Sequence, residues 1–484
     1  MSRMIHHLEC TRRPSRIPQR FIWSFSLALS GLSACSPGDL LDVPPPANVT
    51  AVGDLHNQSG AELLFDGAHA KFARGFSGEY QFLPWNSVLT DEYTWSALQG
   101  EWGTHRVNID ARSTTRVPNA FDEVGDDGLQ AMLAARSVLL IAVDGLKQYE
   151  PASGHAKIGE ALALVGYTEL LMAESYCAGV PLSHAAPDGG AVFEHPLSTD
   201  SLLGTAIAHF DSAVVYAGVN DTIHALASVG LARAWLARGD YVRAAAAVAG
   251  VPTSFHYDAQ LQPTYSGSPG YINNYSAQLS MTGNCGYLSI SDREGGNGLN
   301  FRSANDPRLV IDSTSTTTCD GGVFYYPAKF GVPSTTIPLA TGVEARLIEA
   351  EAALQNNDPD AWASTLNTLR ASAPATYLNL AAAVPVLITD STTAATSDRQ
   401  VDVMFRERAF WLFGTGTRLG DMRRLIRQYH RDANTVFPSG TYPNGNNLPV
   451  PLPTYGTDVS LTLPVAGTTQ NPYYQGCLTP PSTP

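Results

Sequence analysis

Apolar residues between positions 121 and 250 recur at steps of three and four, the spacing of one face of an α-helix. The first positions with this spacing are Met132, Ala135, Leu139, Val143 and Leu146. Leu164, Tyr167 and Leu171 continue the pattern further along the chain. The spacing predicts a series of amphipathic helices that bury their apolar faces against one another.

A helix–turn–helix unit closes this segment. Ser198 and Thr199 form a capping signal that predicts the start of one helix. Two more helices are predicted in HALASVGLARAWLARGDYVRAAAAVAG, joined by Gly239-Asp240. Tyr241 opens the second of them, whose small Ala side chains allow close approach. The pair is typical of tetratricopeptide repeats.

The helical spacing ends near residue 251 and returns later. Residues 251–335 are rich in Gly, Asn, Ser, Tyr and Pro, which is typical of long loops with short strands. Helices are predicted again within 341–373 and 398–430, whereas residues 50–120 alternate aromatic and turn residues. The pattern predicts a mainly α protein with an irregular, loop-rich region between two helical regions.

Composition indicates an acidic protein with a large core. The chain has 484 residues, of which 44% are hydrophobic and 15% charged, and its net charge is −14. Nucleic acids are bound through clustered Lys and Arg, and the sequence has no basic helix or patch of that kind. No nucleic-acid partner is therefore expected.

The N-terminal residues have the pattern of a bacterial lipoprotein signal. A stretch with several arginines precedes an apolar run from Phe21 to Ala34 that ends in LSAC. Residues 1–34 are predicted to be removed before Cys35, whose thiol would carry a lipid. Residues 35–50, which contain SPGDLLDVPPP, would form an extended linker, so membrane contact would be through the lipid anchor alone. The alternative is an ordinary secretory signal in which Cys35 is incidental.

Four cysteines lie in the body of the chain: Cys177, Cys285, Cys319 and Cys477. In an oxidising compartment they are compatible with two disulfides, and three pairings are possible. We predict a bridge between Cys285 and Cys319, because both lie in loop sequence that a covalent link would stabilise most. The cysteine spacings match no zinc or haem motif, and no metal or other cofactor is expected.

The sequence also lacks the common catalytic motifs HExxH, GxSxG, the P-loop and GxGxxG. Asp91 and Glu92 are adjacent, so they do not readily flank a glycosidic bond from opposite sides. The alternative for this pair is a loop position where both carboxylates bind backbone amides. The chain is therefore not expected to be an enzyme.

The segment FRERAFWLFGTGTRLGDMRRL concentrates arginines: Arg406, Arg408, Arg418, Arg423 and Arg424. Glu407 and Asp421 lie among them. Opposite charges at such short helical spacing are usually structural, so we predict a network of ion pairs rather than a phosphate site.

Seven segments carry a further signal through their order along the chain. They are Cys35 followed by LLDVPPP, DEYTW at 91–95, GEALALVGYTELLMAESYCAGVPLS at 159–183, LARAWLARGDYVRAA, NDPRL at 305–309, EARLIEAEAAL with LNTLRASA, and FRERAFWLFGTGTRLGDMRRL. In this order they resemble the RagB/SusD family of outer-membrane nutrient-binding lipoproteins. One departure is Leu419-Gly420 after Arg418, where the family usually has an aromatic residue.

The resemblance implies one SusD-like domain over residues 51–484. Helical repeats at about 121–250 and 341–430 would form a tetratricopeptide-like α-α superhelix, with the loop-rich ligand-binding region at about 251–335. Such a protein would be lipid-anchored in the outer membrane, facing the cell surface, and would pass oligosaccharides or polysaccharides to a TonB-dependent transporter. Capture of peptides, or a purely structural lid on the same kind of transporter, remains the alternative.

Aromatic residues in loop sequence are the candidate ligand contacts. Sugar rings stack on Trp and Tyr, while Asn, Asp and Arg bind sugar hydroxyl groups. One predicted cluster is Trp95, Trp102, Asp91 and Arg106, and the other is Tyr271, Asn273 and Tyr275. The alternative is that loop aromatics pack onto the core, as predicted for Trp235 and Trp411 in their helical segments.

Overall fold

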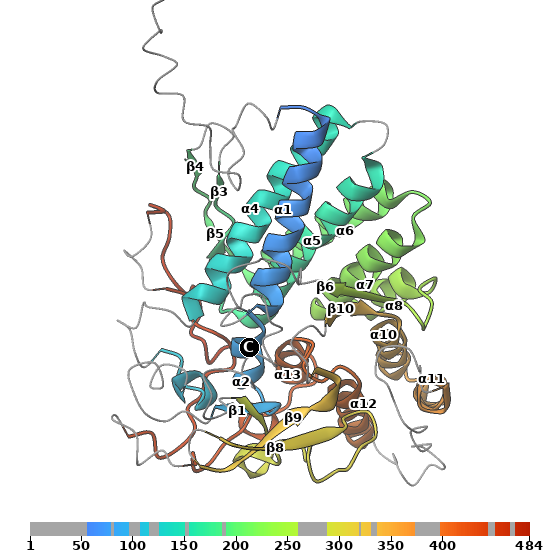
Figure 1. The fold of residues 1–484 in the computed structure, drawn as a ribbon. Coiled ribbons are helices and arrows are strands. Elements are labelled where there is room, and N and C mark those ends of the chain that lie inside the picture. The colour runs from blue at the N-terminus through green and yellow to red at the C-terminus, as the bar shows by residue number, and fades with distance from the viewer. Residues whose placement is uncertain are drawn as a thin grey trace, which may run out of the picture. The chain divides into compact units, whose positions relative to one another are not determined.

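The predicted apolar face is realised in α4 (Gly125–Tyr149), where Met132, Ala135, Leu139, Val143 and Leu146 are all buried. The computed structural model describes residues 56–78, 82–95, 107–115, 125–150, 154–185, 190–259, 288–318, 321–330, 336–372, 397–443, 451–464 and 470–484. Val52–Pro484 form one compact unit. Within it, long helices stand side by side at one end, and the ribbon of β8 (Ile311–Thr317) and β9 (Val323–Pro327) lies at the other (Figure 1).

The first helical group consists of α4 and five further helices. These are α1 (Gln58–Ser77), α5 (His155–Ser175), α6 (Thr199–Ala217), α7 (Asp221–Ala237) and α8 (Tyr241–Val248). From α4 to α8, each helix packs against the next in the chain, and α1 packs against α4. The predicted tetratricopeptide-like helical fold is confirmed.

Short polar side chains fix where these helices begin. Ser198 accepts a hydrogen bond from the backbone N–H of Ser201 at 3.1 Å, as the capping signal predicted. Asn57, Asn220 and Asp240 cap α1, α7 and α8 in the same way. Each cap satisfies a backbone donor that the first turn of a helix leaves without a partner.

Close contact between helices depends on glycine at two positions facing Phe210 of α6. A Cβ atom on Gly166 of α5 would lie 2.8 Å from the Phe210 ring, and one on Gly230 of α7 would lie 2.3 Å from it. Tyr167 meets the same ring edge-on at 5.1 Å between centroids. The Phe210 ring therefore fills the space that the two glycines leave between α5, α6 and α7.

Helix α1 corrects the prediction for residues 50–120. That segment shows aromatic and turn residues, yet Ala61, Phe65, Ala68 and Phe72 recur at helical steps and are buried. The short helix α2 (Phe82–Val88) follows and is buried along its whole length. Both helices contribute to the main core around α4 and α5.

A second helical group follows residue 341. It contains α10 (Gly342–Gln355), α11 (Pro359–Ser372), α12 (Ser397–Trp411), α13 (Arg418–Arg427) and the single turn α14 (Ala433–Val436). Trp411 lies in a separate small core with Trp362 and Met404, as predicted for a core residue. Trp235 of α7 is only partly buried, and it packs against the main core.

The predicted ion-pair network is confirmed in this second group for Arg408, Arg418 and Arg424. Asp421 accepts hydrogen bonds from Arg408 at 2.7 Å and from Arg424 at 2.8 Å. Burial raises the pKa of Asp421, but the two guanidinium groups outweigh burial and bring this pKa to about 2. Glu407 bonds Arg308 at 2.7 Å and also pairs with Arg370. These arginines therefore hold α12 and α13 to their neighbours.

Short antiparallel ribbons complete the described structure. They are β1 (Tyr93–Trp95) with β7 (Leu288–Ile290), β6 (His256–Ala259) with β10 (Ile337–Thr341), β8 (Ile311–Thr317) with β9 (Val323–Pro327), β2 (Val180–Pro181) with β5 (Pro196–Leu197), and β3 (His184–Ala185) with β4 (Ala191–Val192). Short strands were expected in the loop-rich segment 251–335. The β1–β7 ribbon joins residues almost 200 positions apart, Trp95 lying opposite Leu288.

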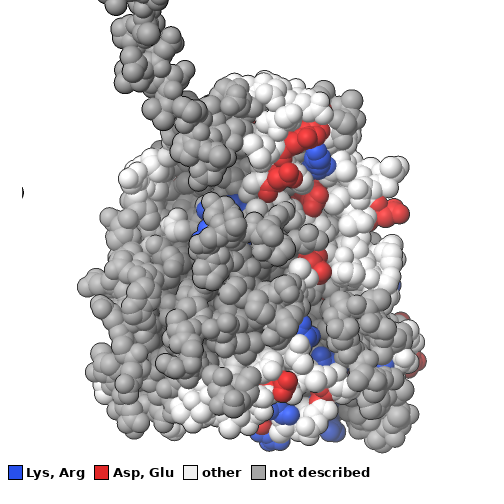
Figure 2. Space-filling model, viewed as in Figure 1, with Lys and Arg blue, Asp and Glu red and all other residues white. Residues whose placement is uncertain are grey.

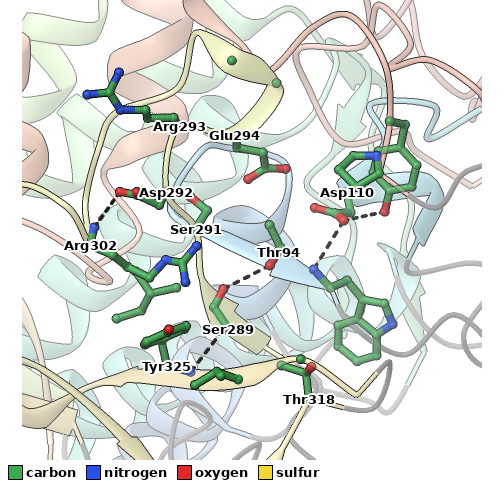
Figure 3. A pocket seen from close by; sticks show the side chains of 18 of the residues that line it. Thr94, Asp110, Ser289, Ser291, Asp292, Arg293, Glu294, Arg302, Thr318 and Tyr325 are labelled. Atoms are coloured by element: carbon green, nitrogen blue, oxygen red, sulfur yellow. Dashed lines mark hydrogen bonds between the residues drawn. The ribbon is translucent and has the colours of Figure 1, made fainter.

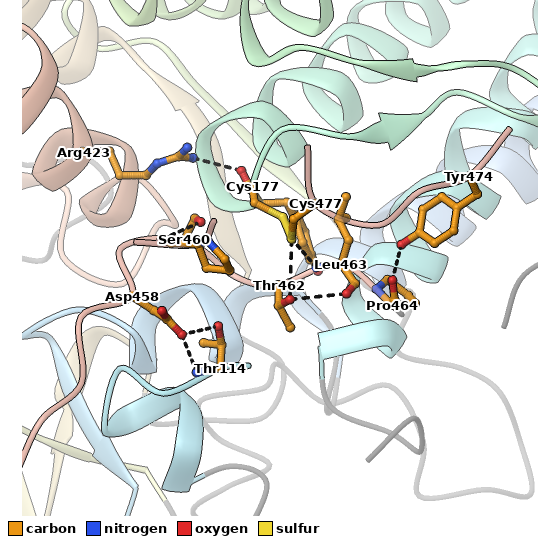
Figure 4. Close-up of a disulfide and its surroundings, with 12 residues drawn as sticks. Thr114, Cys177, Arg423, Asp458, Ser460, Thr462, Leu463, Pro464, Tyr474 and Cys477 are labelled. Carbon is orange, nitrogen blue, oxygen red and sulfur yellow. Dashed lines mark hydrogen bonds between the residues drawn. A yellow bond between two sulfur atoms is a disulfide. The ribbon is translucent and has the colours of Figure 1, made fainter. Parts of the chain in front are cut away.

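One disulfide joins Cys177, just after α5, to Cys477 in the C-terminal tail, with 5.6 Å between the Cα atoms (Figure 4). The tail is also bound through its backbone, because Leu461 and Cys177 form a hydrogen bond of 3.0 Å. Cys285 and Cys319 lie outside the described residues, so their bridge stays a prediction. Of the three possible pairings, only the one with Cys285–Cys319 is compatible with the bridge observed.

Charged side chains are spread over the visible face of the molecule. In Figure 2, acidic side chains gather over the end where α1 begins, and the basic side chains at the opposite end are interspersed with acidic ones. Within the described residues one helical segment, Gly128–Tyr149 of α4, is long and apolar enough to cross a membrane. Half of its apolar window is buried inside this fold, and its buried side chains belong to the main core.

Candidate ligand-binding site

A pocket of about 620 Å³ lies beside the β1–β7 ribbon (Figure 3). Its walls come from both strands, from the turn η3 (Glu294–Gly296), from β9 and from a later segment around Tyr442. The polar side chains that line it are Thr94, Asp110, Ser289, Ser291, Asp292, Arg293, Glu294, Arg302, Thr318, Tyr325, Thr441, Tyr442 and Tyr455. Most of the wall lies between residues 288 and 325, inside the segment predicted to be loop-rich.

The tight turn at η3 shapes one wall. Gly295 has a φ of +62°, and a Cβ atom there would lie 2.3 Å from the backbone nitrogen of Ser439. Only glycine tolerates both the left-handed conformation and this close approach. The turn places Glu294 against the pocket with 6% of its surface exposed.

Arg302 and Tyr325 stack on each other in the pocket, and the pair is called the Arg302–Tyr325 surface below. The guanidinium carbon of Arg302 lies 4.3 Å from the centre of the Tyr325 ring. Tyr325 is fixed by its backbone N–H, which donates a hydrogen bond of 3.1 Å to the hydroxyl of Ser289. Figure 3 shows the Arg302 side chain extending toward the middle of the pocket.

Two buried carboxyl groups, Asp110 and Glu294, face each other across another part of the wall. Tyr442 donates to Asp110 at 2.6 Å, and Tyr455 donates to Glu294 at 3.1 Å. Burial raises the pKa of Asp110 to about 7, although hydrogen bonds from Tyr442 and from the Trp95 backbone oppose the rise. Burial and the charge of Asp110 raise the pKa of Glu294 well above its usual value. Burial and mutual repulsion therefore favour the protonated form of this pair.

Asp292 is the remaining carboxylate of the pocket. One of its oxygens accepts three hydrogen bonds, from the backbone N–H of Arg302 at 3.0 Å and from the N–H and hydroxyl of Ser303 at 2.9 and 3.1 Å. These bonds fix the turn that carries Arg302. The hydroxyl of Thr94 donates to the Ser289 carbonyl at 3.4 Å, so donors and acceptors surround the Arg302–Tyr325 surface.

Asp91, predicted as a ligand contact, is instead a structural residue. Its side chain is 1% exposed and binds Arg418 through two hydrogen bonds of 2.7 and 2.9 Å. It also accepts the backbone N–H of Leu299 at 2.8 Å, and Glu92 accepts that of Gly414 at 3.0 Å. The alternative considered for this pair, two loop carboxylates bound to backbone amides, is the one observed.

Trp95 lines the pocket but is 3% exposed. Its ring packs against Trp85 with 6.1 Å between centroids, and it belongs to the main core. Trp95 thus lies in the pocket wall mainly as a core residue, and its predicted contact with a ligand stays a prediction. The predicted contacts Trp102, Arg106, Tyr271, Asn273 and Tyr275 lie outside the described residues.

Sequence reasoning missed Arg302, Tyr325 and the Asp110–Glu294 pair. A usable signal existed in SDREGGNGLNFR, where a Gly-Gly turn stands among charged residues that flank a short strand. Asp110 carries no such signal, because it reaches Glu294 only through the folding of distant segments. Among the described residues no group of three or more His, Cys, Asp or Glu side chains could hold a metal ion.

Comparison with known proteins supports this architecture. The model of the SusD family matches residues 344–464, which span α10 to α14 and part of the tail. NanU of B. fragilis has a TM-score of 0.56 at 13% identity, covering 89% of this chain and 99% of its own. A SusD superfamily protein from Bacteroides thetaiotaomicron has a TM-score of 0.55 at 15% identity, covering 80% and 95%. A SusD-like carbohydrate binding protein from Bacteroides fragilis has 0.53 at 14% identity, covering 76% and 86%.

The fold and the pocket together define a class of protein. Its members have a scaffold of helical repeats that carries a pocket built from loops and short ribbons. Residues 344–464 match the SusD family model, and the SusD-type structures above share the fold of this chain, as its motif order implied. No match was found among curated proteins. The structural neighbours are too distant in sequence to transfer a ligand, so the pocket itself carries the functional argument.

Proposed function

We propose that this protein is a capture lipoprotein that binds glycans at the cell surface and delivers them to a TonB-dependent outer-membrane transporter. The supporting observation is the pocket built on the Arg302–Tyr325 surface. The solved relative from Bacteroides fragilis is described as a SusD-like carbohydrate binding protein, which agrees with this proposal.

The pocket has the chemistry that sugars require. A sugar ring offers an apolar face of C–H groups and a rim of hydroxyls, which bind aromatic faces and paired donors and acceptors. Tyr325 supplies the aromatic face, and Ser289, Thr94 and Asp292 supply polar groups around it. Such a site binds without breaking bonds, in keeping with a role in capture rather than catalysis.

The test is calorimetric titration with a panel of oligosaccharides and a panel of peptides. Tyr325→Ala should lower glycan affinity by roughly tenfold or more, since a central aromatic contact contributes about 1–3 kcal/mol. Tyr326→Ala is the matched control, because neighbouring residues of a strand point to opposite faces and Tyr326 does not line the pocket. Binding of peptides alone would replace this proposal by the peptide-capture alternative.

Anchoring and delivery form the second half of the proposal. Cys35→Ala should move the protein from the membrane fraction to the soluble fraction of the native cell. A tagged wild-type protein, extracted in mild detergent, should carry a TonB-dependent transporter with it. Recovery of the protein without such a transporter after crosslinking in intact cells would contradict delivery while leaving glycan binding untouched.

A further inference from the structure

We propose that the pocket selects anionic glycans and that Arg302 holds their charged group. This inference rests on the proposed glycan-binding function and names its substrate class. Two kinds of sugar carry such a charged group: sugars with a carboxylate, such as uronic acids, and sugars with a sulfate ester.

Arg302, which is half-buried, differs from five buried arginines of this protein in having no charged partner. Arg308, Arg370, Arg408, Arg418 and Arg424 each form an ion pair with a carboxylate. No described carboxylate pairs with the guanidinium of Arg302, and its Nε is buried without a hydrogen-bond partner. A buried donor without a partner costs free energy, so a ligand that supplies an acceptor there gains it back on binding.

The Arg302 guanidinium is held in place before any ligand binds. Its face lies on Tyr325, and its backbone N–H is fixed by Asp292. A planar guanidinium presents two parallel N–H donors, which match the two oxygens of a carboxylate or sulfate. Because the group is already oriented, little side-chain entropy remains to be lost when an anion binds.

Negative charge in the pocket is small for a protein with a net charge of −14. Burial raises the pKa of both Asp110 and Glu294, which favours their neutral forms. Asp292 is the remaining lining carboxylate in the described wall, and one of its oxygens already accepts three hydrogen bonds. An anion entering the pocket therefore meets the Arg302 guanidinium and little repulsion.

Hydroxyl groups complete the recognition of a sugar rather than of a simple anion. Ser289, Ser291 and Thr94 line the pocket beside Arg302 (Figure 3). A sugar acid bound with its charge on Arg302 can direct its hydroxyls toward these residues. A bare inorganic anion would use only the first of these contacts.

The experiment measures binding of matched ligand pairs to the full mature protein. Oligomers of galacturonate, glucuronate and alginate are each compared with their carboxyl-reduced forms, and sulfated galactan and chondroitin oligosaccharides with their desulfated forms. At least one anionic oligomer should bind wild type tenfold or more tightly than its neutral counterpart. Arg302→Met, which keeps the packing on Tyr325 but removes the charge, should abolish that difference.

Arg243→Met is the control variant. Arg243 also lies over an aromatic ring, 4.6 Å from the centre of Trp235, but on the surface of α8 away from the pocket. The Arg243→Met substitution removes the same charge as Arg302→Met and should leave the preference for the anionic oligomer unchanged. The pair of variants thus separates a local contact from a general effect of net charge.

Each outcome decides the proposal. Equal binding of charged and neutral partners, or a preference that Arg302→Met leaves intact, would overturn it while glycan capture stands. Binding of no glycan in the panel would overturn both this inference and the proposed function. The carboxylated and sulfated arms identify which anionic group the site accepts.

Discussion

At the scale of single residues, the pKa of a buried carboxyl group in this protein depends on the groups that surround it. Asp421 lies between two arginines, which hold its pKa at about 2. Asp110 has a second carboxyl group and two tyrosines around it instead, and its pKa rises to about 7. The first group is a permanent ion of the scaffold, whereas the second lies in the pocket wall and titrates in the neutral range.

Asp110 predicts a pH dependence of stability. Its pKa is about 7 in the folded state against 3.8 for the ordinary group, so the folded state binds more protons between these values. Stability should therefore fall as pH rises from about 4 to 7. Asp110→Asn cannot ionise and should be stabilised relative to wild type by roughly 2–4 kcal/mol more at pH 8 than at pH 4.

Urea unfolding at several pH values measures this difference. Glu294, Tyr442 and Tyr455 face or neighbour Asp110, and Glu294 titrates with it. Glu294→Gln is therefore a second variant that should flatten the same part of the pH profile. If the difference in unfolding free energy between Asp110→Asn and wild type does not change with pH, the raised pKa of Asp110 is refuted.

Because Trp95 is buried, we expect that replacing it lowers the stability of the fold rather than weakening ligand binding alone. Removing its ring would leave a cavity against Trp85, so Trp95→Ala should lower the free energy of unfolding by about 3–5 kcal/mol. Trp95→Phe keeps a ring in the same space and should lose less. Thermal denaturation measures both variants, and an unchanged melting temperature for Trp95→Ala would show that the ring is not part of the core.

At the scale of elements, local patterns predicted the helices well and the pocket poorly. The faces of α4, α5 and α7 follow from apolar spacing within one segment. Even α1, which was missed, shows that spacing in Ala61, Phe65 and Ala68. The pocket depends on the pairing of β1 with β7, and no local pattern indicates which distant strand pairs with a given one.

The residues of the site show the same limit. The loop-rich segment was recognised from its composition, and it contains Arg302 and Tyr325. Asp91 and Trp95 were chosen because their sequence neighbours are polar, but their burial comes from Arg418 and Trp85. Arg418 lies 327 residues away from Asp91, which places the contact beyond any local reading of the sequence.

The close contact between helices α6 and α7 can be tested by substitution. Gly230→Ala would place a methyl group 2.3 Å from the Phe210 ring, and it should lower the free energy of unfolding by about 1–3 kcal/mol. Gly204→Ala on α6 is the control, because no atom lies within 4 Å of the added group. That variant should be neutral or more stable by up to about 1 kcal/mol, since alanine favours the helix. Chemical denaturation of both variants tests whether the close approach is real.

At the scale of the whole molecule, the tail is bound to the helical scaffold by a disulfide. Replacing both Cys177 and Cys477 by Ser should lower the free energy of unfolding by about 2–5 kcal/mol. A reductant should lower the melting temperature of wild type toward that of the double variant. The same reductant should affect the double variant much less, and equal melting temperatures before any reduction would contradict a stabilising bridge.

The same bond turns most of the polypeptide into a closed ring, because it joins residues 300 positions apart. A protease that cuts one loop within the ring opens it but releases no fragment. For a protein proposed to stand outside the cell among extracellular enzymes, a single nick would thus leave the pieces attached and the fold in place. In denaturing solution such a nicked molecule would run as one species until the disulfide is reduced, and only then separate into two chains.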